Sequence, residues 1–434
     1  MNPRIEILTR AQLIILIIFT VAGQFSISIT HLCGFLASAL WLYKTHVTRS
    51  WNQLRWPLWI PFAGFALASM LAVVTALDPL KSFEHLKRLF EMGIFFLILN
   101  SLSDPTLKTS LHALLNKLKE TRPGQFLLGK SEAVTSFSLR DFFIGLIVLS
   151  ASLSAMTGII QVMINGLSIH HRISGTLSIY MTFAGLMMQA ALVATAYLLF
   201  RNGKNKWVWS ALLLITVALT LTLTRQAWLG FCSGLIILLA FRKSIWVILL
   251  PAFVMLVFWI SPPPIKERVE SIANLDDVTF QERLSMWQLG WDIYKDYPLT
   301  GCGFHCLMKV RTDYPKHKEI SRGYGTLHSN IVQLAVDTGA VGVLAWFFLW
   351  LTFLGRVYCM ELKRKPNSDG DTPDRWIVLA SFSAVVAFLV GGLFETNFYD
   401  SEVVMLTYFL MALPFVDPDK KSITQAATQP QNGH

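Results

Sequence analysis

Arg225 stands out because it is the only charged residue between Trp207 and Phe241. An ionisable side chain among membrane helices is costly and suggests a functional role by default. A guanidinium offers forked donors that match phosphate oxygens. The alternative is an arginine at a turn, with its head group reaching water. Arg225 is therefore a candidate phosphate ligand, with a surface role left open.

Two further residues could take part in the same chemistry. Arg283 lies in an amphipathic stretch from Glu282 to Tyr297. Its spacing alone favours a solvated surface charge, paired with Glu282 or Asp277, over a ligand. His328 lies where a long polar loop returns to an apolar run. Histidine titrates near neutral pH and can accept a proton from a hydroxyl, so His328 is a candidate general base or a structural loop histidine.

Two basic turns are candidate substrate contacts. Lys81, His85 and Arg88 recur at helical spacing and share one stripe. Arg172 lies in a second basic turn that begins at His170. Each turn could either anchor the chain to anionic headgroups or receive a lipid-linked pyrophosphate.

The amino-acid composition indicates which structural elements hold these residues in place. Of the 434 residues, 53% are hydrophobic and 15% are charged, whereas a soluble domain carries about 25% charged residues. The apolar residues form blocks near the ~20 residues that a helix needs to cross a bilayer. Backbone groups in lipid must be paired internally, so the blocks should be helices. We predict an all-α polytopic membrane protein.

The predicted organisation has about 12 transmembrane helices. Residues 1–260 hold the first nine, with a cytoplasmic hairpin at 104–141; residues 261–337 form a long periplasmic loop with short helices and the catalytic elements. Residues 338–416 hold the last three spans, and 417–434 form a disordered cytoplasmic tail. The predicted spans are 11–24, 27–43, 57–76, 88–103, 142–163, 177–200, 207–223, 227–241, 244–260, 338–358, 376–394 and 403–416.

The net charge of +10 reflects topology more than a nucleic-acid partner. With the N-terminus in the cytoplasm, most of the 37 lysines and arginines fall in cytoplasmic segments, as the positive-inside rule requires. Both termini are then cytoplasmic, and Arg225, Arg283 and His328 should converge at the outer face. We expect no nucleic acid among the partners.

A metal site is not expected. Cys302, His305 and Cys306 lie in a glycine-rich turn, but their spacing matches no zinc motif. A disulfide between Cys302 and Cys306 would be possible outside the cytoplasm.

The chain resembles the O-antigen ligase and polymerase superfamily of lipid-linked glycan transferases. The resemblance is densest from Arg172 to Gly342. It rests on Arg172-x-x-Gly175, Thr224-Arg225-x-Ala-Trp228-x-Gly230, Arg283-x-x-x-Trp287, Pro298-Leu-x-Gly301-x-Gly303, and His328-Ser followed by Gly339-x-x-Gly342. Each motif alone is weak, whereas their order around one long outer loop is specific.

The resemblance implies a GT-C-like fold and an O-antigen ligase of the bacterial inner membrane. Such an enzyme moves a glycan from undecaprenyl pyrophosphate to a sugar hydroxyl of lipid A-core at the periplasmic face. His328 would be the base, and Arg225 and Arg283 would hold the pyrophosphate. The implied inverting displacement uses no metal or cofactor. Membrane lipids are the other expected partners.

Three alternatives stay open. An O-antigen polymerase typically has a second large outer loop between the fifth and sixth spans, where this chain has only about 164–176. A protein O-oligosaccharyltransferase usually has more extracytoplasmic sequence at its C-terminus. A transporter would place ionisable residues at the bilayer midplane, on interrupted helices.

Overall fold

A computed structural model of the chain describes residues 3–119, 138–168, 171–201, 205–242, 261–274, 276–317, 325–362 and 374–416, with 245, 247 and 259 singly. The regular structure of these residues is helical, with no strand among them. The helices are α1 (Pro3–Ala22), α2 (Ile27–Thr48), α3 (Trp59–Val74), α4 (Pro79–Glu84), α5 (Lys87–Leu102), α6 (Pro105–Lys119), α8 (Leu139–Asn165), α9 (Tyr180–Phe200), α10 (Lys206–Leu221), α11 (Arg225–Phe241), α13 (Pro263–Ala273), α14 (Val278–Asp296), α15 (Leu307–Val310), α17 (Asn330–Leu362), α18 (Arg375–Gly391) and α19 (Ser401–Ala412).

The helices match an all-α membrane protein. Among the described residues, α1, α8, α9 and most of α17 are long and apolar enough to cross a bilayer, and α3, α10, α11, α18 and the α19 region are shorter apolar helices. Eleven of the predicted spans each overlap one helix. The twelfth, 244–260, lies almost wholly outside the described residues.

Helix α9 is the centre of the bundle. Its apolar residues are buried almost throughout, and it packs against α8, α10, α11 and α18. Gln189 is one of its buried polar residues, and its Nε2 donates to Thr407 Oγ1 in α19 over 2.9 Å. A buried amide needs such a partner, so this contact fixes the register of α9 against α19.

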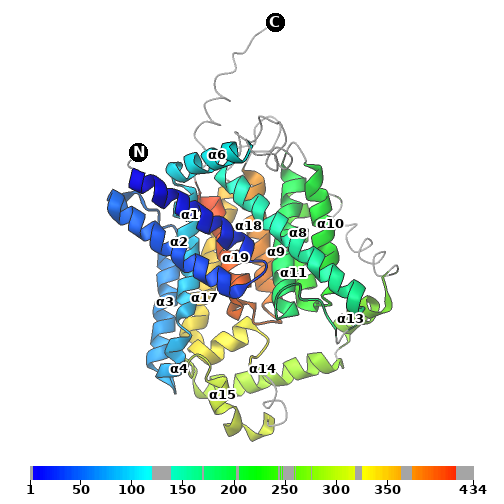
Figure 1. Ribbon diagram of the computed structural model, residues 1–434. Coiled ribbons are helices and arrows are strands. Elements are labelled where there is room, and N and C mark those ends of the chain that lie inside the picture. Colours follow the sequence, from blue (N-terminus) through cyan, green and yellow to red (C-terminus); the bar gives the residue numbers. More distant parts are fainter. Residues whose placement is uncertain are drawn as a thin grey trace.

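Helix α14 lies across one end of the bundle, with α13, α15 and α4 around it (Figure 1). We call this the α14 end. It is also where α17 bends: Gly339 has a φ of +60° and interrupts the helical backbone. A Cβ at Gly339 would lie 2.3 Å from the carbonyl carbon of Leu299. Glycine is therefore required both for the bend and for the close passage of the 298–301 segment.

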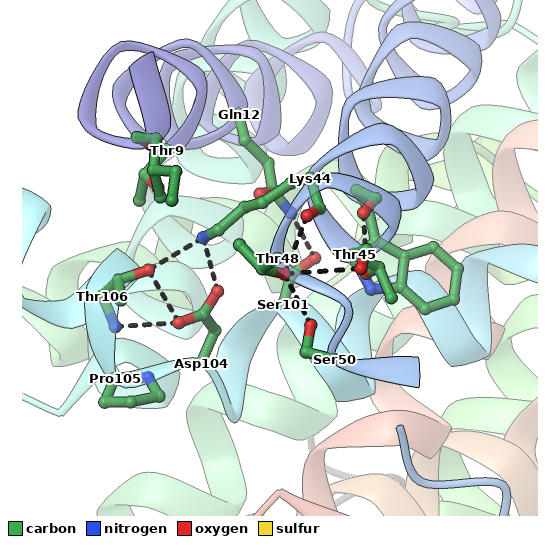
Figure 2. Close-up of polar contacts among 12 residues, drawn as sticks. Thr9, Gln12, Lys44, Thr45, Thr48, Ser50, Ser101, Asp104, Pro105 and Thr106 are labelled. Carbon is green, nitrogen blue, oxygen red and sulfur yellow. Dashed lines mark hydrogen bonds and ion pairs between the residues drawn. The ribbon is translucent and has the colours of Figure 1, made fainter. Parts of the chain in front are cut away.

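The opposite, α6 end is closed by ion pairs. Lys44 Nζ lies 2.6 Å from Asp104 Oδ2 and donates to Thr106 Oγ1 over 2.8 Å (Figure 2). Gln12 of α1 donates to Ser101 of α5 over 2.9 Å beside it (Figure 2). These contacts join α1, α2, α5 and α6.

Several local predictions need correction. The span predicted over 338–358 is not a separate helix: it is the second part of one bent helix, α17, whose first part lies in the predicted periplasmic loop. Just before the bend, the Asp337 carboxylate accepts from Gln333 and from the Tyr399 hydroxyl. The segment expected as a surface hairpin at 104–141 begins with α6, which buries Leu107, Leu111 and Leu115.

Candidate functional site

His328 is held in an unusual backbone conformation just before α17. Its φ is +47°, a left-handed region that costs a non-glycine residue about 1–3 kcal/mol and is common at functional sites. The preceding residue is fixed on both sides. Leu327 N donates to Gln333 Oε1 over 3.0 Å, and Leu327 O accepts from Trp287 Nε1 over 3.1 Å.

Asn330 joins this turn to the segment between α18 and α19. Its backbone N donates to Gly392 O over 2.8 Å. Its side-chain oxygen accepts from Phe398 N over 3.0 Å, and its Nδ2 donates to Asn397 Oδ1 over 2.6 Å. The 392–398 segment is therefore fastened to the His328 turn at both ends, and Glu395 lies between the two points of attachment.

Glu395 contacts two candidate residues, His328 and Arg283, and also Gln226. His328 Nδ1 lies 3.0 Å from Glu395 Oε1, Arg283 Nη2 lies 3.6 Å from Oε2, and Gln226 Nε2 donates to Oε2 over 3.3 Å. Burial raises the pKa of Glu395, but the hydrogen bond from His328 and the charges of His328 and Arg283 outweigh burial and lower it overall. An ionised carboxylate only accepts hydrogen bonds. Nδ1 of His328 therefore donates to the carboxylate, which leaves Nε2 as the ring nitrogen that can accept a proton when the imidazole is neutral.

Arg225 begins α11 immediately after a strained turn. Leu223 in that turn has a φ of +53° and is fully buried. The Arg225 guanidinium is 7% exposed and is held by α13 and the start of α14. Its Nη1 donates to Ser271 O over 2.7 Å, and its Nη2 to Asp277 Oδ1 over 3.0 Å.

Arg268 completes the cationic group, although the sequence did not single it out. It is buried, and its Nε donates to Leu223 O over 3.1 Å. Burial, followed by the charges of Arg225 and Arg172, lowers the pKa of Arg268 to about 10. It therefore stays charged at neutral pH while neighbouring cations repel it. An anion bound there would relieve that repulsion.

Arg172 belongs to the same group. Its guanidinium lies over the Tyr180 ring, 4.7 Å from the centroid. The charge of Arg172 acts on both Arg268 and Arg283, lowering their pKa values after the larger effect of burial. The structure thus brings Arg172, Arg225, Arg283 and His328 together, from four separate segments. We call Arg172, Arg225, Arg268 and Arg283 the arginine group.

The other three predicted residues, Lys81, His85 and Arg88, do not contact the arginine group in this way. They lie in a second set of contacts around α4 and the start of α5. The Arg88 guanidinium lies 3.8 Å from the centroid of the Tyr399 ring, whose hydroxyl donates to Asp337. His85 stacks on His305 at 5.1 Å, and Lys81 is exposed on α4. Burial and the charge of Arg88 lower the pKa of His85.

The arrangement combines two chemical capacities. The arginine group offers forked donors for an anion such as a phosphate. His328, oriented by Glu395, offers a base beside them, which is the logic of a carboxylate-held histidine. Within the described part of the chain, no cluster of three or more His, Cys, Asp and Glu side chains is positioned to hold a metal. Cys302 and Cys306 form a disulfide.

Comparison with known families gives one match. Residues 210–347 match the family model described as O-antigen ligase. This match supports an assignment to the O-antigen ligase and polymerase family. The match begins within α10, ends in α17 beyond its bend, and contains Arg225, Arg268, Arg283 and His328. No curated protein matches the chain.

The family match indicates the general class of reaction. The O-antigen ligase family acts on lipid-linked glycans, and the match therefore supports a glycosyltransferase-like enzyme in the context of lipopolysaccharide assembly. Arg172 and Glu395 lie outside the matched residues and join the site through the fold. Glu395 carried one weak signal in the sequence, since it is the first charge after the apolar run from Trp376 to Phe394.

Proposed function

We propose that the protein is an O-antigen ligase of the bacterial inner membrane. It transfers a polysaccharide from undecaprenyl pyrophosphate to a sugar hydroxyl of lipid A-core, completing lipopolysaccharide. The α14 end faces the periplasm, and both termini lie in the cytoplasm. Twelve transmembrane helices in a GT-C-like arrangement would then surround the site.

One observation carries the proposal: a histidine oriented by a buried carboxylate stands beside a group of arginines. His328 Nδ1 lies 3.0 Å from Glu395, and the same carboxylate faces Arg283. A glycan transferase with a pyrophosphate leaving group needs a base and a fixed set of cations. Cations in a water-poor site can stabilise developing negative charge without reorganising.

The reaction is a direct displacement at the anomeric carbon. Nε2 of His328 removes the proton from the acceptor hydroxyl as its oxygen forms the new glycosidic bond. The bond from the anomeric carbon to the pyrophosphate breaks, and the electron pair leaves on a phosphate oxygen. Arg225 and Arg283 hold that pyrophosphate, with Arg172 and Arg268 adding positive charge. Attack opposite the leaving group inverts the anomeric configuration.

The second set of contacts has a less direct role in this proposal. Lys81 and Arg88 supply the positive charge of an approach for the donor headgroup as it arrives from the lipid, and His85 lies between them as a hydrogen-bonding group. Anionic lipid headgroups would bind the same surface electrostatically.

Deletion of the gene tests the proposal. A ligase null should retain lipid A-core and accumulate polymerised glycan on its carrier. A polymerase null should instead leave single repeat units attached to the core, and that pattern would replace ligase with polymerase as the function. A null with normal lipopolysaccharide would overturn both assignments.

A further inference from the structure

Beyond Arg283, helix α14 presents two tryptophans on one face. Trp287 and Trp291 are four residues apart, so they are neighbours on the helix surface. Trp291 is 59% exposed, and its ring stacks on Tyr294 with the centroids 5.4 Å apart. An aromatic surface this open beside a candidate site needs an explanation.

Two hollows meet at these tryptophans. One is an apolar groove of about 490 Å³ between α14 and α17, lined further by Ile331, Val332, Val343 and Leu344. The other is a more polar hollow of about 420 Å³, where the same two rings face Gln288, Asp292, Lys316 and His317. Leu344 is 68% exposed on α17, an apolar helix long enough to cross a bilayer. The groove therefore opens toward lipid, and the hollow lies on its polar side.

The tryptophans are also connected to the candidate base. Trp287 Nε1 donates to Leu327 O, next to His328. Arg283 lies one helical turn before Trp287 on the same face. Along α14, Arg283 therefore comes first, on the side proposed for the phosphates. Trp287 follows next to the candidate base, and the two hollows lie beyond it. The distance from Trp287 to Trp291 along the axis is about 6 Å, close to the size of one sugar ring.

We propose that these two hollows bind the acceptor glycolipid, with a sugar in the polar hollow against Trp291 and a hydrocarbon chain in the apolar groove. The inference rests on the proposed function and names the acceptor subsite for it. A sugar presents an apolar face of C–H groups to an aromatic ring and hydroxyls to its edges. Gln288 and Asp292 supply the donors and acceptors that hydroxyls need.

The geometry favours the acceptor over the donor as the occupant. In an inverting displacement the attacking hydroxyl and the leaving group lie on opposite sides of the reacting carbon. The arginine group marks the side of the pyrophosphate. The two hollows lie on the other side of Trp287 from Arg283, where the acceptor would approach. Exposed tryptophans also anchor proteins at the bilayer interface. An anchor alone would have no need of the polar side chains or of the connection to the His328 turn.

The first test is steady-state transfer by purified, reconstituted protein. Trp291→Ala should raise the acceptor KM about tenfold, the loss of roughly 1.4 kcal/mol, with the donor KM and the kcat at saturating acceptor unchanged. Trp291→Phe should recover most of the affinity. Trp209→Ala, which removes another exposed tryptophan from α10, is the matched control and should leave both KM values unchanged.

A second pair of variants tests the groove. Val343→Phe narrows it and should raise the KM of an acylated acceptor, but not that of the same saccharide without acyl chains. Val341→Phe lies on the same helix, is 40% exposed and is the control. Running core glycolipid and carrier-linked glycan as alternative acceptors shows which of these amphiphiles the subsite takes.

The outcomes separate this inference from the proposed function. A rise in the donor KM for Trp291→Ala, or equal effects of Trp291→Ala and Trp209→Ala, would overturn the acceptor subsite. Direct binding of the core saccharide and glycolipid is measured in parallel by thermophoresis. If wild type transferred glycan to neither acceptor but bound the saccharide in a Trp291-dependent way, the proposed function would fail and the subsite would stand.

Discussion

The two ends of the bundle handle charge in different ways. At the α6 end three cations each pair with a separate carboxylate: Arg140 with Asp374 at 2.7 Å, Arg201 with Asp141 at 2.9 Å, and Lys44 with Asp104 at 2.6 Å. At the α14 end Arg225 and Arg283 also face carboxylates, but the arginines lie close enough to act on one another. Burial, followed by the charges of Arg225 and Arg172, lowers the pKa of Arg268 to about 10. Ion pairs of one cation with one carboxylate hold helices together, whereas a cluster of cations can still bind an anion.

The base assignment gives the largest expected effect. His328→Ala should lower transfer by about 10²–10⁴-fold, the usual contribution of general acid–base catalysis, while donor binding is largely kept. A neutral imidazole contributes little to holding a pyrophosphate. Transfer and carrier-lipid binding are measured on the same folded variant. If His328→Ala lost donor binding but kept turnover at saturating donor, His328 would be a phosphate ligand.

The arginine group is expected to act on both binding and transfer. Arg225→Ala and Arg283→Ala should each lower transfer by about 10²–10³-fold, as removal of a charge-stabilising donor does, and should weaken donor binding. Arg→Lys should recover little, because an ammonium cannot reproduce a forked contact. Binding and kinetics of all four variants provide the check. Full recovery by lysine would mean that charge alone matters.

Glu395 should control the histidine and the acid stability of the α14 end. Glu395→Gln should lower transfer by about 10²-fold, the lower end of the range for acid–base catalysis, because an amide cannot stabilise the imidazolium. The pKa of Glu395 is lowered in the fold. Its stabilising contribution is therefore complete above its unfolded pKa and is lost as the pH falls through the folded one.

Thermal unfolding between pH 6 and pH 3 tests this sign. Wild type should lose more stability over that interval than Glu395→Gln, which has no carboxylate to protonate. An equal loss in both proteins would mean that Glu395 is not the titrating group.

The α6 end should show stability effects without catalytic ones. Lys44 is 7% exposed, and Lys44→Met would leave Asp104 without its cation, at a cost of about 1–3 kcal/mol of unfolding free energy. Lys44→Met with Asp104→Leu should recover part of that loss. Both KM values at a permissive temperature should match wild type. A change in the donor KM would show that the α6 end also contributes to substrate binding.

Removal of metal ions by a chelator is expected to have no effect on the transfer rate. The family resemblance implies a metal-independent transfer, and the arginine group already supplies positive charge for the pyrophosphate. EDTA should leave the transfer rate unchanged. Loss of activity that magnesium or manganese restored would show that a cation shares the site with Asp277 and Glu395.

The sequence by itself determined the helices and most of the cationic residues. Apolar blocks of bilayer length placed eleven spans on described helices, because hydrophobic periodicity and helix length are local properties. The isolated charge of Arg225 and the family motifs around Arg283 and His328 were likewise visible along the chain. Boundaries were less well placed, as with the bend at Gly339.

The tertiary structure decided which residues meet. Spacing favoured Glu282 or Asp277 as the partner of Arg283, yet Arg283 faces Glu395 and Asp277 binds Arg225. His328 and Glu395 are 67 residues apart, and no periodicity carries information over that distance. Their meeting depends on Asn330, which fastens the two turns together. Burial and neighbouring cations, which make Arg268 part of the site, exist only once α11, α13 and α14 have packed.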